Sequence, residues 1–132
     1  MSDPADLARG WFRKGDSDLY NTRLVAASAG PYDTGCFHAQ QAIEKYLKAF
    51  LAFHRQPIPR THDLEELERL CNLVEPLPEL AAYDLAALTD YAVQLRYDFA
   101  VWPKLPELED ALRKAEGVRA AIVAYLPPDA HP

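Results

Sequence analysis

The chain has 132 residues, a formal net charge of −6 and 49% hydrophobic residues, which suits one folded domain that needs no disulfide or metal staple. This composition argues against disorder, and the acidic balance disfavours broad, non-specific binding to nucleic acid. No apolar run approaches the roughly 20 residues of a membrane span, and the start MSDPADLARG lacks the pattern of a secretory signal. We therefore expect a cytoplasmic protein.

Two long helices are predicted in the first half of the chain. Apolar residues recur at helical spacing from Asp6 to Ala29, and the Gly-Pro pair at 30–31 ends this helix. A second helix should begin at residue 32 or 33 and run to about Phe53. Pro57 and Pro59 forbid its continuation, so RQPIPRTHD is predicted as an extended loop.

Three further helices are predicted in the second half. A short helix should start at the capping box DLEE, residues 63–66, and end near residue 72. A fourth should run from about 79 to 98 and a last one from about 106 to 126, followed by a frayed tail. Since no stretch shows sustained two-residue alternation, we expect no sheet. The prediction is one all-α domain over residues 1–132, with its core over about 5–126, folded as an up-and-down bundle of four or five helices.

The two cysteines, Cys36 and Cys71, are interpreted as small buried hydrophobes. Neither belongs to a Cys-x-x-Cys pair, and no His or Cys stands at zinc-finger spacing from them. His38 and His54 lie too far apart on one helix to form a local metal pair. There is also no glycine-rich phosphate loop and no Gly-x-Ser-x-Gly elbow, so we predict no metal and no cofactor.

The stretch CFHAQQAIEKYLKAFLAFH, residues 36–54, carries unusual polar residues for a core helix. Gln41, Lys45 and Lys48 fall at i, i+4 and i+7 and share one face, where two ammonium groups could hold one phosphate. The pattern equally fits a solvated surface, because Glu44 and Lys48 can form an ordinary exposed ion pair one turn apart.

The loop after this helix adds to a basic region. Between residues 41 and 62 the cations are Lys45, Lys48, Arg55 and Arg60 against the single carboxylate Glu44, a local balance of +3. His62 could join Lys48 near a bound phosphate. It could instead be merely a residue at the start of a helix, next to the capping residues of that start.

A second polar group is QLRYD, residues 94–98. Arg96 could bind a phosphate, and Tyr97 could stack on a nucleobase, although core packing is the more ordinary role of such a tyrosine. Phe99 and Trp102 follow in a break between helices. They could lie at an interface, but a place in the core under the loop is slightly favoured.

Three segments in this order resemble the HEPN domain family: CFHAQQAIEKYLKAFL, then PRTHDLEEL, then LRYD. The resemblance covers about residues 5–126. It implies a helical bundle that commonly forms homodimers. It also implies that the protein is encoded beside, or fused to, a minimal nucleotidyltransferase. In that setting the protein would bind nucleotide or act as the substrate-binding partner of the enzyme.

The function expected from this resemblance is a non-catalytic binding module, within a toxin–antitoxin system. The candidate ligand-binding residues are Gln41, Lys45, Lys48, His62, Arg96 and Tyr97, with no catalytic residue among them.

An alternative is the branch of the family that consists of metal-independent ribonuclease toxins. Resemblance to that branch would imply an Arg followed four to six residues later by a His, near the start of a late helix. The comparable arginine is Arg96, but residues 97–103 contain no histidine, which disfavours this alternative. If RNA were cleaved, Arg96 and His62 would be the candidates.

Overall fold

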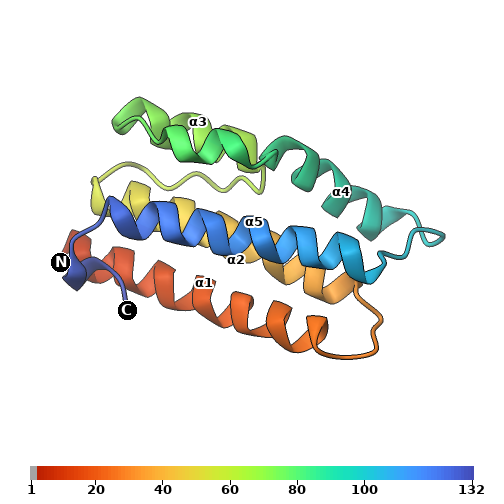
Figure 1. Ribbon diagram of the computed structural model, residues 1–132. Coiled ribbons are helices and arrows are strands. Elements are labelled where there is room, and N and C mark those ends of the chain that lie inside the picture. Colours follow the sequence, from red (N-terminus) through yellow and green to blue (C-terminus); the bar gives the residue numbers. More distant parts are fainter. Residues whose placement is uncertain (1–2) are drawn as a thin grey trace.

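The computed structural model describes residues 3–132, and this range contains helices and no strand (Figure 1). The all-α prediction is therefore confirmed. The elements are α1 (Pro4–Ala26), α2 (Asp33–Phe53), α3 (Leu64–Val74), the 3-10 helix η1 (Pro78–Ala82), α4 (Leu85–Tyr97), α5 (Leu105–Ala124) and the 3-10 helix η2 (Pro128–Ala130).

Local chemistry explains the ends of α1. The Asp3 side chain accepts a hydrogen bond of 2.7 Å from the backbone N–H of Ala5, and Pro4 occupies the first helical position, where a missing N–H costs nothing. Beyond Ala26 the chain turns at Gly30, whose φ of +88° favours glycine because it lacks a Cβ. The helix thus begins slightly earlier and ends slightly earlier than its periodicity predicted.

Helix α2 is the central element, and α1, α3, α4 and α5 all pack on it. Its apolar side is fully buried, with Ile43, Tyr46, Leu47 and Phe50 inaccessible to solvent. Figure 1 shows α1 antiparallel to α2 and α5 running in the same direction as α2. Side chains from three sides therefore cover this helix, and the side that approaches solvent carries mainly polar residues, with Phe37 near its start.

The loop between α2 and α3 runs back along α2, so α3 has the same direction as α2 (Figure 1). The contacts agree, since His62 meets Glu44 in the middle of α2, whereas Cys71 donates from its thiol to the carbonyl of Leu47, one turn further on. Asp63 caps α3 as predicted, accepting from the N–H groups of residues 65 and 66. The reciprocal half of the capping box is absent, because Glu66 pairs with Arg69 instead.

The single fourth helix predicted over 79–98 is wrong, because two elements occupy this stretch. Tyr83 is extended between η1 and α4, and the side chain of Asp84 caps α4 by accepting from the N–H of Ala87 at 3.1 Å. The Tyr83 ring packs against Gly117 of α5, where a Cβ would overlap its hydroxyl group. The apolar spacing continues through the break, so periodicity alone did not reveal it.

The C-terminal tail packs on α1, contrary to the predicted fraying. Ala130 in η2 is fully buried, and the Arg9 guanidinium donates to the carbonyl of His131 at 2.6 Å. The His131 ring lies 6.0 Å from the ring of Phe12. The tail therefore extends the core past residue 126.

The other end of the molecule exposes aromatic side chains. Tyr97, Phe99 and Trp102 are 73%, 88% and 61% exposed, so their predicted burial is wrong. Both cysteines are buried as predicted, and burial raises the pKa of each thiol to about 12.

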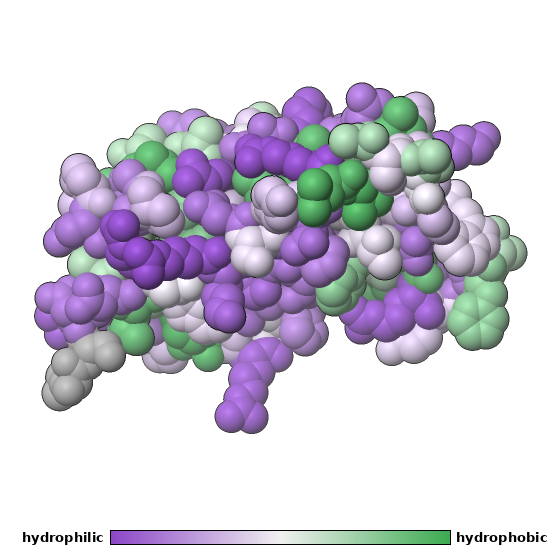
Figure 2. Space-filling model, turned by 90° about the horizontal axis from the view of Figure 1, so that it is seen from below, coloured by the Kyte–Doolittle hydropathy of each residue, from purple (hydrophilic) through white to green (hydrophobic). Residues whose placement is uncertain are grey.

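The surface is mixed rather than uniformly polar. Figure 2, which views the molecule from the α1 side, shows a largely hydrophilic face with a hydrophobic patch toward the end where α1 finishes. Among the described residues, no helix is both long and apolar enough to cross a bilayer.

Candidate functional site

Helix α2 buries polar side chains that an ordinary solvated face would leave in water. Gln40, Glu44 and Lys48 are only 3%, 4% and 6% exposed. Burying a charge is costly unless it is paired and hydrogen-bonded. The interpretation of Glu44 and Lys48 as an exposed pair is therefore wrong, and their partners define a specific cluster.

The first cluster is centred on Glu44. Its Oε2 lies 3.2 Å from Nζ of Lys48, and its Oε1 lies 2.7 Å from Nδ1 of His62. Because a carboxylate only accepts, Nδ1 of His62 carries a proton and the other ring nitrogen, Nε2, points elsewhere. The His62 side chain is 67% exposed, so Nε2 is presented toward solvent. His62 is therefore more than a residue at a helix start.

Two further residues complete this Glu44 cluster. The side-chain amide of Gln40 donates to the backbone carbonyl of His62 at 3.3 Å, which fastens the loop to α2. Its buried Oε1 has no hydrogen-bond partner within the described chain. The Trp11 ring of α1 covers Lys48, with Nζ 5.6 Å from the ring centroid.

The second cluster is centred on Asp18 of α1. Its Oδ1 lies 2.7 Å from Nδ1 of His38, and its Oδ2 accepts from Nζ of Lys45. Thr22, one turn further on, is fully buried and donates to the carbonyl of Gly35 at 3.0 Å, which fixes the register of α1 against α2. Each carboxylate, Asp18 and Glu44, thus holds one histidine and one lysine.

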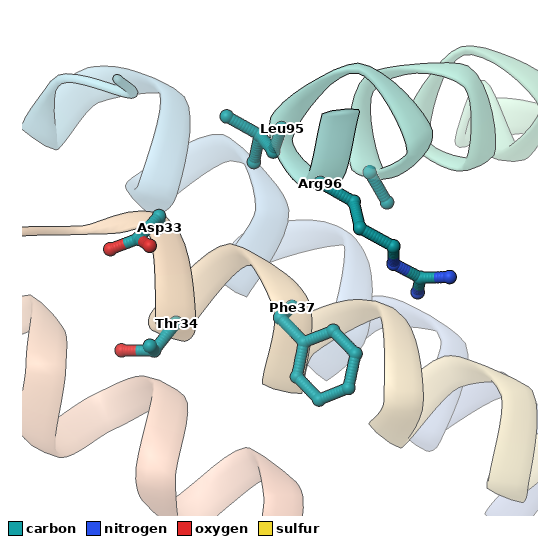
Figure 3. A pocket seen from close by; sticks show the side chains of 6 residues that line it. Asp33, Thr34, Phe37, Leu95 and Arg96 are labelled. Carbon is teal, nitrogen blue, oxygen red and sulfur yellow. The ribbon is translucent and has the colours of Figure 1, made fainter. Parts of the chain in front are cut away.

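Arg96 lies apart from both clusters, in a pocket of about 200 Å³ between the end of α4 and the start of α2. Its guanidinium makes no ion pair within residues 3–132. Figure 3 shows Arg96 and Phe37 on one side of this pocket, while the Asp33 and Thr34 side chains point away from the guanidinium. The pocket thus joins an unneutralised cation to an aromatic ring, and its lining residues are Asp33, Thr34, Phe37, Ala92, Leu95 and Arg96.

The six predicted ligand-binding residues therefore do not form one compact group. Lys45 belongs to the Asp18 cluster, and Lys48 and His62 belong to the Glu44 cluster. Gln41 is half-buried and its side chain makes no hydrogen bond within the described residues. Tyr97 is exposed next to Arg96. No structural finding tests their ligand-binding roles, which stay predictions.

The two clusters and the pocket nevertheless share one side of α2. Phe37 and Glu44 are seven residues apart, which is two helical turns or about 10 Å along the axis. Gln41 and Lys45 lie within the same stripe. The Arg96 pocket, the Asp18 cluster and the Glu44 cluster therefore lie along this one side of the helix.

The sequence reasoning missed Asp18, His38 and Trp11 as members of this surface. His38 stands seven residues before Lys45, so it shares the face of the predicted lysine, and this spacing was a usable signal. Asp18 and Trp11 are also seven residues apart on α1. Nothing local indicated which α2 residues they would meet, because the contacts span 20 to 37 positions of the chain.

A third polar network, nearer the core, has a structural character. Arg119 of α5 donates to both oxygens of Asp16, at 2.8 and 3.1 Å, and the Tyr46 hydroxyl donates to Asp16 at 2.7 Å. Burial opposes ionisation of Asp16, but the hydrogen bonds from Arg119 and Tyr46 outweigh it, so the pKa of this carboxyl lies below its usual range. Burial, together with the bond to Asp16, raises the pKa of Tyr46.

A metal centre finds no support in the described residues. Within 3–132, no group of three or more His, Cys, Asp or Glu side chains is arranged to hold an ion. The clusters contain one histidine and one carboxylate each, with a lysine that competes for the same oxygens.

Comparisons with known proteins agree with the architecture. The chain is similar to TT1696 from Thermus thermophilus, a crystal structure that superposes with a TM-score of 0.74 at 27% identity, over 90% of this chain and 98% of that chain. A comparison with curated proteins gave no match. The model of the HEPN domain matches residues 8–125, nearly the whole helical bundle and every residue of the two clusters and the pocket. The chain therefore belongs to the HEPN domain family.

Proposed function

We propose that this protein is a non-catalytic nucleotide-binding module that serves a minimal nucleotidyltransferase as its substrate-binding partner. The observation that carries the proposal is Arg96, an exposed guanidinium without an ion-pair partner in the described chain, beside the ring of Phe37. A guanidinium fork binds phosphate in a bidentate manner, and an aromatic face stacks on any base.

A nucleotide would lie along the polar side of α2. The base would stack on Phe37, or on Tyr97 at the end of α4, and the phosphates would meet Arg96. The amide of Gln41 lies one turn beyond Phe37 and has both donors and an acceptor to offer. A longer phosphate chain would then approach Lys45 and Lys48, whose charges are matched by Asp18 and Glu44 in the absence of ligand.

Calorimetric titration with ATP, ADP and AMP tests the nucleotide site. We expect saturable binding that Arg96→Ala weakens by roughly tenfold to a hundredfold, because one charged hydrogen-bonding partner contributes about 1.5–3 kcal/mol. The matched control is Arg69→Ala, which removes an exposed arginine already paired with Glu66 on α3. Equal weakening by both variants would point to general charge rather than to this pocket.

The partner part of the proposal needs a separate experiment. We propose a homodimer located in the cytoplasm that acts within a toxin–antitoxin module and binds a nucleotidyltransferase encoded by a neighbouring gene. Light scattering of the purified chain gives the mass in solution, and co-expression with that enzyme shows whether the two elute together. A monomer that fails to retain the enzyme would contradict this part alone.

A second candidate function is metal-independent RNA cleavage, favoured by the geometry of His62. Its Nδ1 is held by buried Glu44 and its Nε2 faces solvent, as in a general base whose ring is oriented by a carboxylate. Nε2 would take the proton of a 2′-hydroxyl that attacks the adjacent phosphorus, while the 5′ oxygen leaves and takes a proton from water. Incubation of RNA with micromolar protein in EDTA tests this, and intact RNA would eliminate it.

A further inference from the structure

The clusters around Asp18 and Glu44 repeat one arrangement. In each, one carboxylate oxygen faces a lysine Nζ and the other lies 2.7 Å from a histidine Nδ1. Lysine and carboxylate balance each other when the histidine is neutral. A histidine that gained a proton would therefore become a second cation beside the same carboxylate.

This arrangement matters when an anion approaches the lysines. A phosphate that draws Lys48 toward itself leaves Glu44, only 5% exposed in its side chain, without its cation. An uncompensated buried charge is strongly unfavourable. Protonation of His62 replaces the missing charge at hydrogen-bond distance, and His38 stands in the same relation to Asp18 when Lys45 is drawn away.

We propose that phosphate binding on this side of α2 takes up protons, with His62 and His38 as the acceptors. The inference rests on the proposed nucleotide site and adds its regulation. Because binding would add protons to these histidines, affinity should fall as pH rises from 6 to 8. Linkage limits the loss to about tenfold per pH unit for each histidine that is protonated on binding.

The charged groups that surround each histidine favour this exchange. His62 faces Glu44 and, through it, Lys48 of α2. The charged residues nearest to His62 along the chain are Arg60 and Asp63. The backbone carbonyl of His62 accepts from the neutral amide of Gln40, which fastens this part of the loop to α2.

The surroundings of His38 are comparable. It faces Asp18 of α1 and, through it, Lys45 of α2, with the Phe37 ring 5.5 Å away. No second carboxylate among the described residues is paired with either histidine.

Calorimetry with ADP in two buffers of different ionisation enthalpy measures the proton uptake directly. At pH 7 we expect the observed enthalpy to change with the buffer in the direction of proton uptake. His62→Asn keeps an amide donor toward Glu44 but cannot gain a proton, and should reduce the uptake. His38→Asn should do the same independently, whereas His131→Asn, in the tail, should leave it unchanged.

The outcomes separate this inference from the proposed function. Binding with the same enthalpy in both buffers would overturn the proton coupling and leave the nucleotide site standing. Absence of ADP binding would overturn both. If His62→Asn fails to fold, as judged by circular dichroism, imidazole NMR shifts of the unaltered protein on ADP addition decide the matter, since unmoved His62 and His38 signals contradict the inference.

Discussion

The Asp16 network and the Arg96 pocket each contain an arginine, but within the described chain only the arginine of the network is paired with a carboxylate. Arg119 is 32% exposed in its side chain, binds both oxygens of Asp16 and lies over the ring of Phe12. Arg96 lines a pocket together with the Phe37 ring, but it forms no ion pair with a carboxylate in the described chain. The comparison teaches that a satisfied cation holds helices together, whereas an unsatisfied one is available to a ligand.

The Glu44 cluster combines a buried, paired lysine with an exposed histidine. Removing its carboxylate should have the largest effect on stability. Glu44→Ala leaves Lys48 buried without a counter-charge, so the free energy of unfolding should fall by about 3–5 kcal/mol. Urea unfolding followed by circular dichroism measures it. Glu66→Ala, which breaks the exposed pair with Arg69, should leave the unfolding midpoint almost unchanged, because solvent screens that pair. Similar losses in both variants would contradict the prediction, because they would mean that solvent screens the Glu44–Lys48 pair as it screens an exposed one.

A change at Gly15 would break the packing that supports the Asp16 network. A Cβ at Gly15 would lie 2.7 Å from the Tyr46 ring, which is fully buried, so Gly15→Ala should destabilise by about 1–3 kcal/mol. Gly10→Ala is the matched control on the same helix, because nothing lies within 4 Å of its Cβ position. That control should be stabilising, by up to about 1 kcal/mol. The ordering of the two unfolding midpoints is the measurement.

The dependence of stability on acid pH should show that the paired carboxylate of Asp16 stabilises the fold. The pKa of Asp16 is lowered in the folded chain, so its contribution to stability is complete above the unfolded value of about 3.9 and is lost as pH falls through the lower folded value. Asp16→Asn should therefore lose less stability than the unaltered protein between about pH 5 and pH 2. Unfolding curves across this range test it, and parallel losses in both would contradict the assignment.

Arg96→Ala should have the smallest effect on stability and the largest on ligand binding. The side chain is exposed and supports no contact between helices through an ion pair in the described chain, so unfolding should change by less than about 0.5 kcal/mol. The same variant should lose most of its affinity for nucleotide. A variant that loses stability and retains its affinity would reverse the comparison with Arg119.

The helices were predictable from the sequence to the extent that local chemistry determines them. Apolar spacing located α1, α2 and α5, and Asp63 marked the start of α3. The break before α4 was missed because Tyr83 keeps the apolar spacing while its ring packs against α5. A contact with a distant helix therefore overrode the local pattern.

The candidate site was predictable only in part. Family resemblance and spacing selected Lys45, Lys48 and His62, but an i, i+4 pair looks the same in sequence whether water or a Trp11 ring covers it. Their carboxylate and histidine partners became visible only when α1 and the loop were brought against α2. The exposure of Tyr97 likewise depends on the end of α4 projecting beyond the bundle, which no local pattern encodes.

The length of the loop that returns along α2 determines where His62 lies. It joins Phe53 to Leu64 with a fixed number of residues, and two prolines restrict how far it can stretch. One residue inserted between Pro59 and His62 would add about 3.3 Å of reach, more than the whole distance from Nδ1 to Glu44. A variant with such an insertion should keep the five helices but move the imidazole of this histidine away from Glu44, so the number of residues in this segment determines which side chain meets the buried carboxylate.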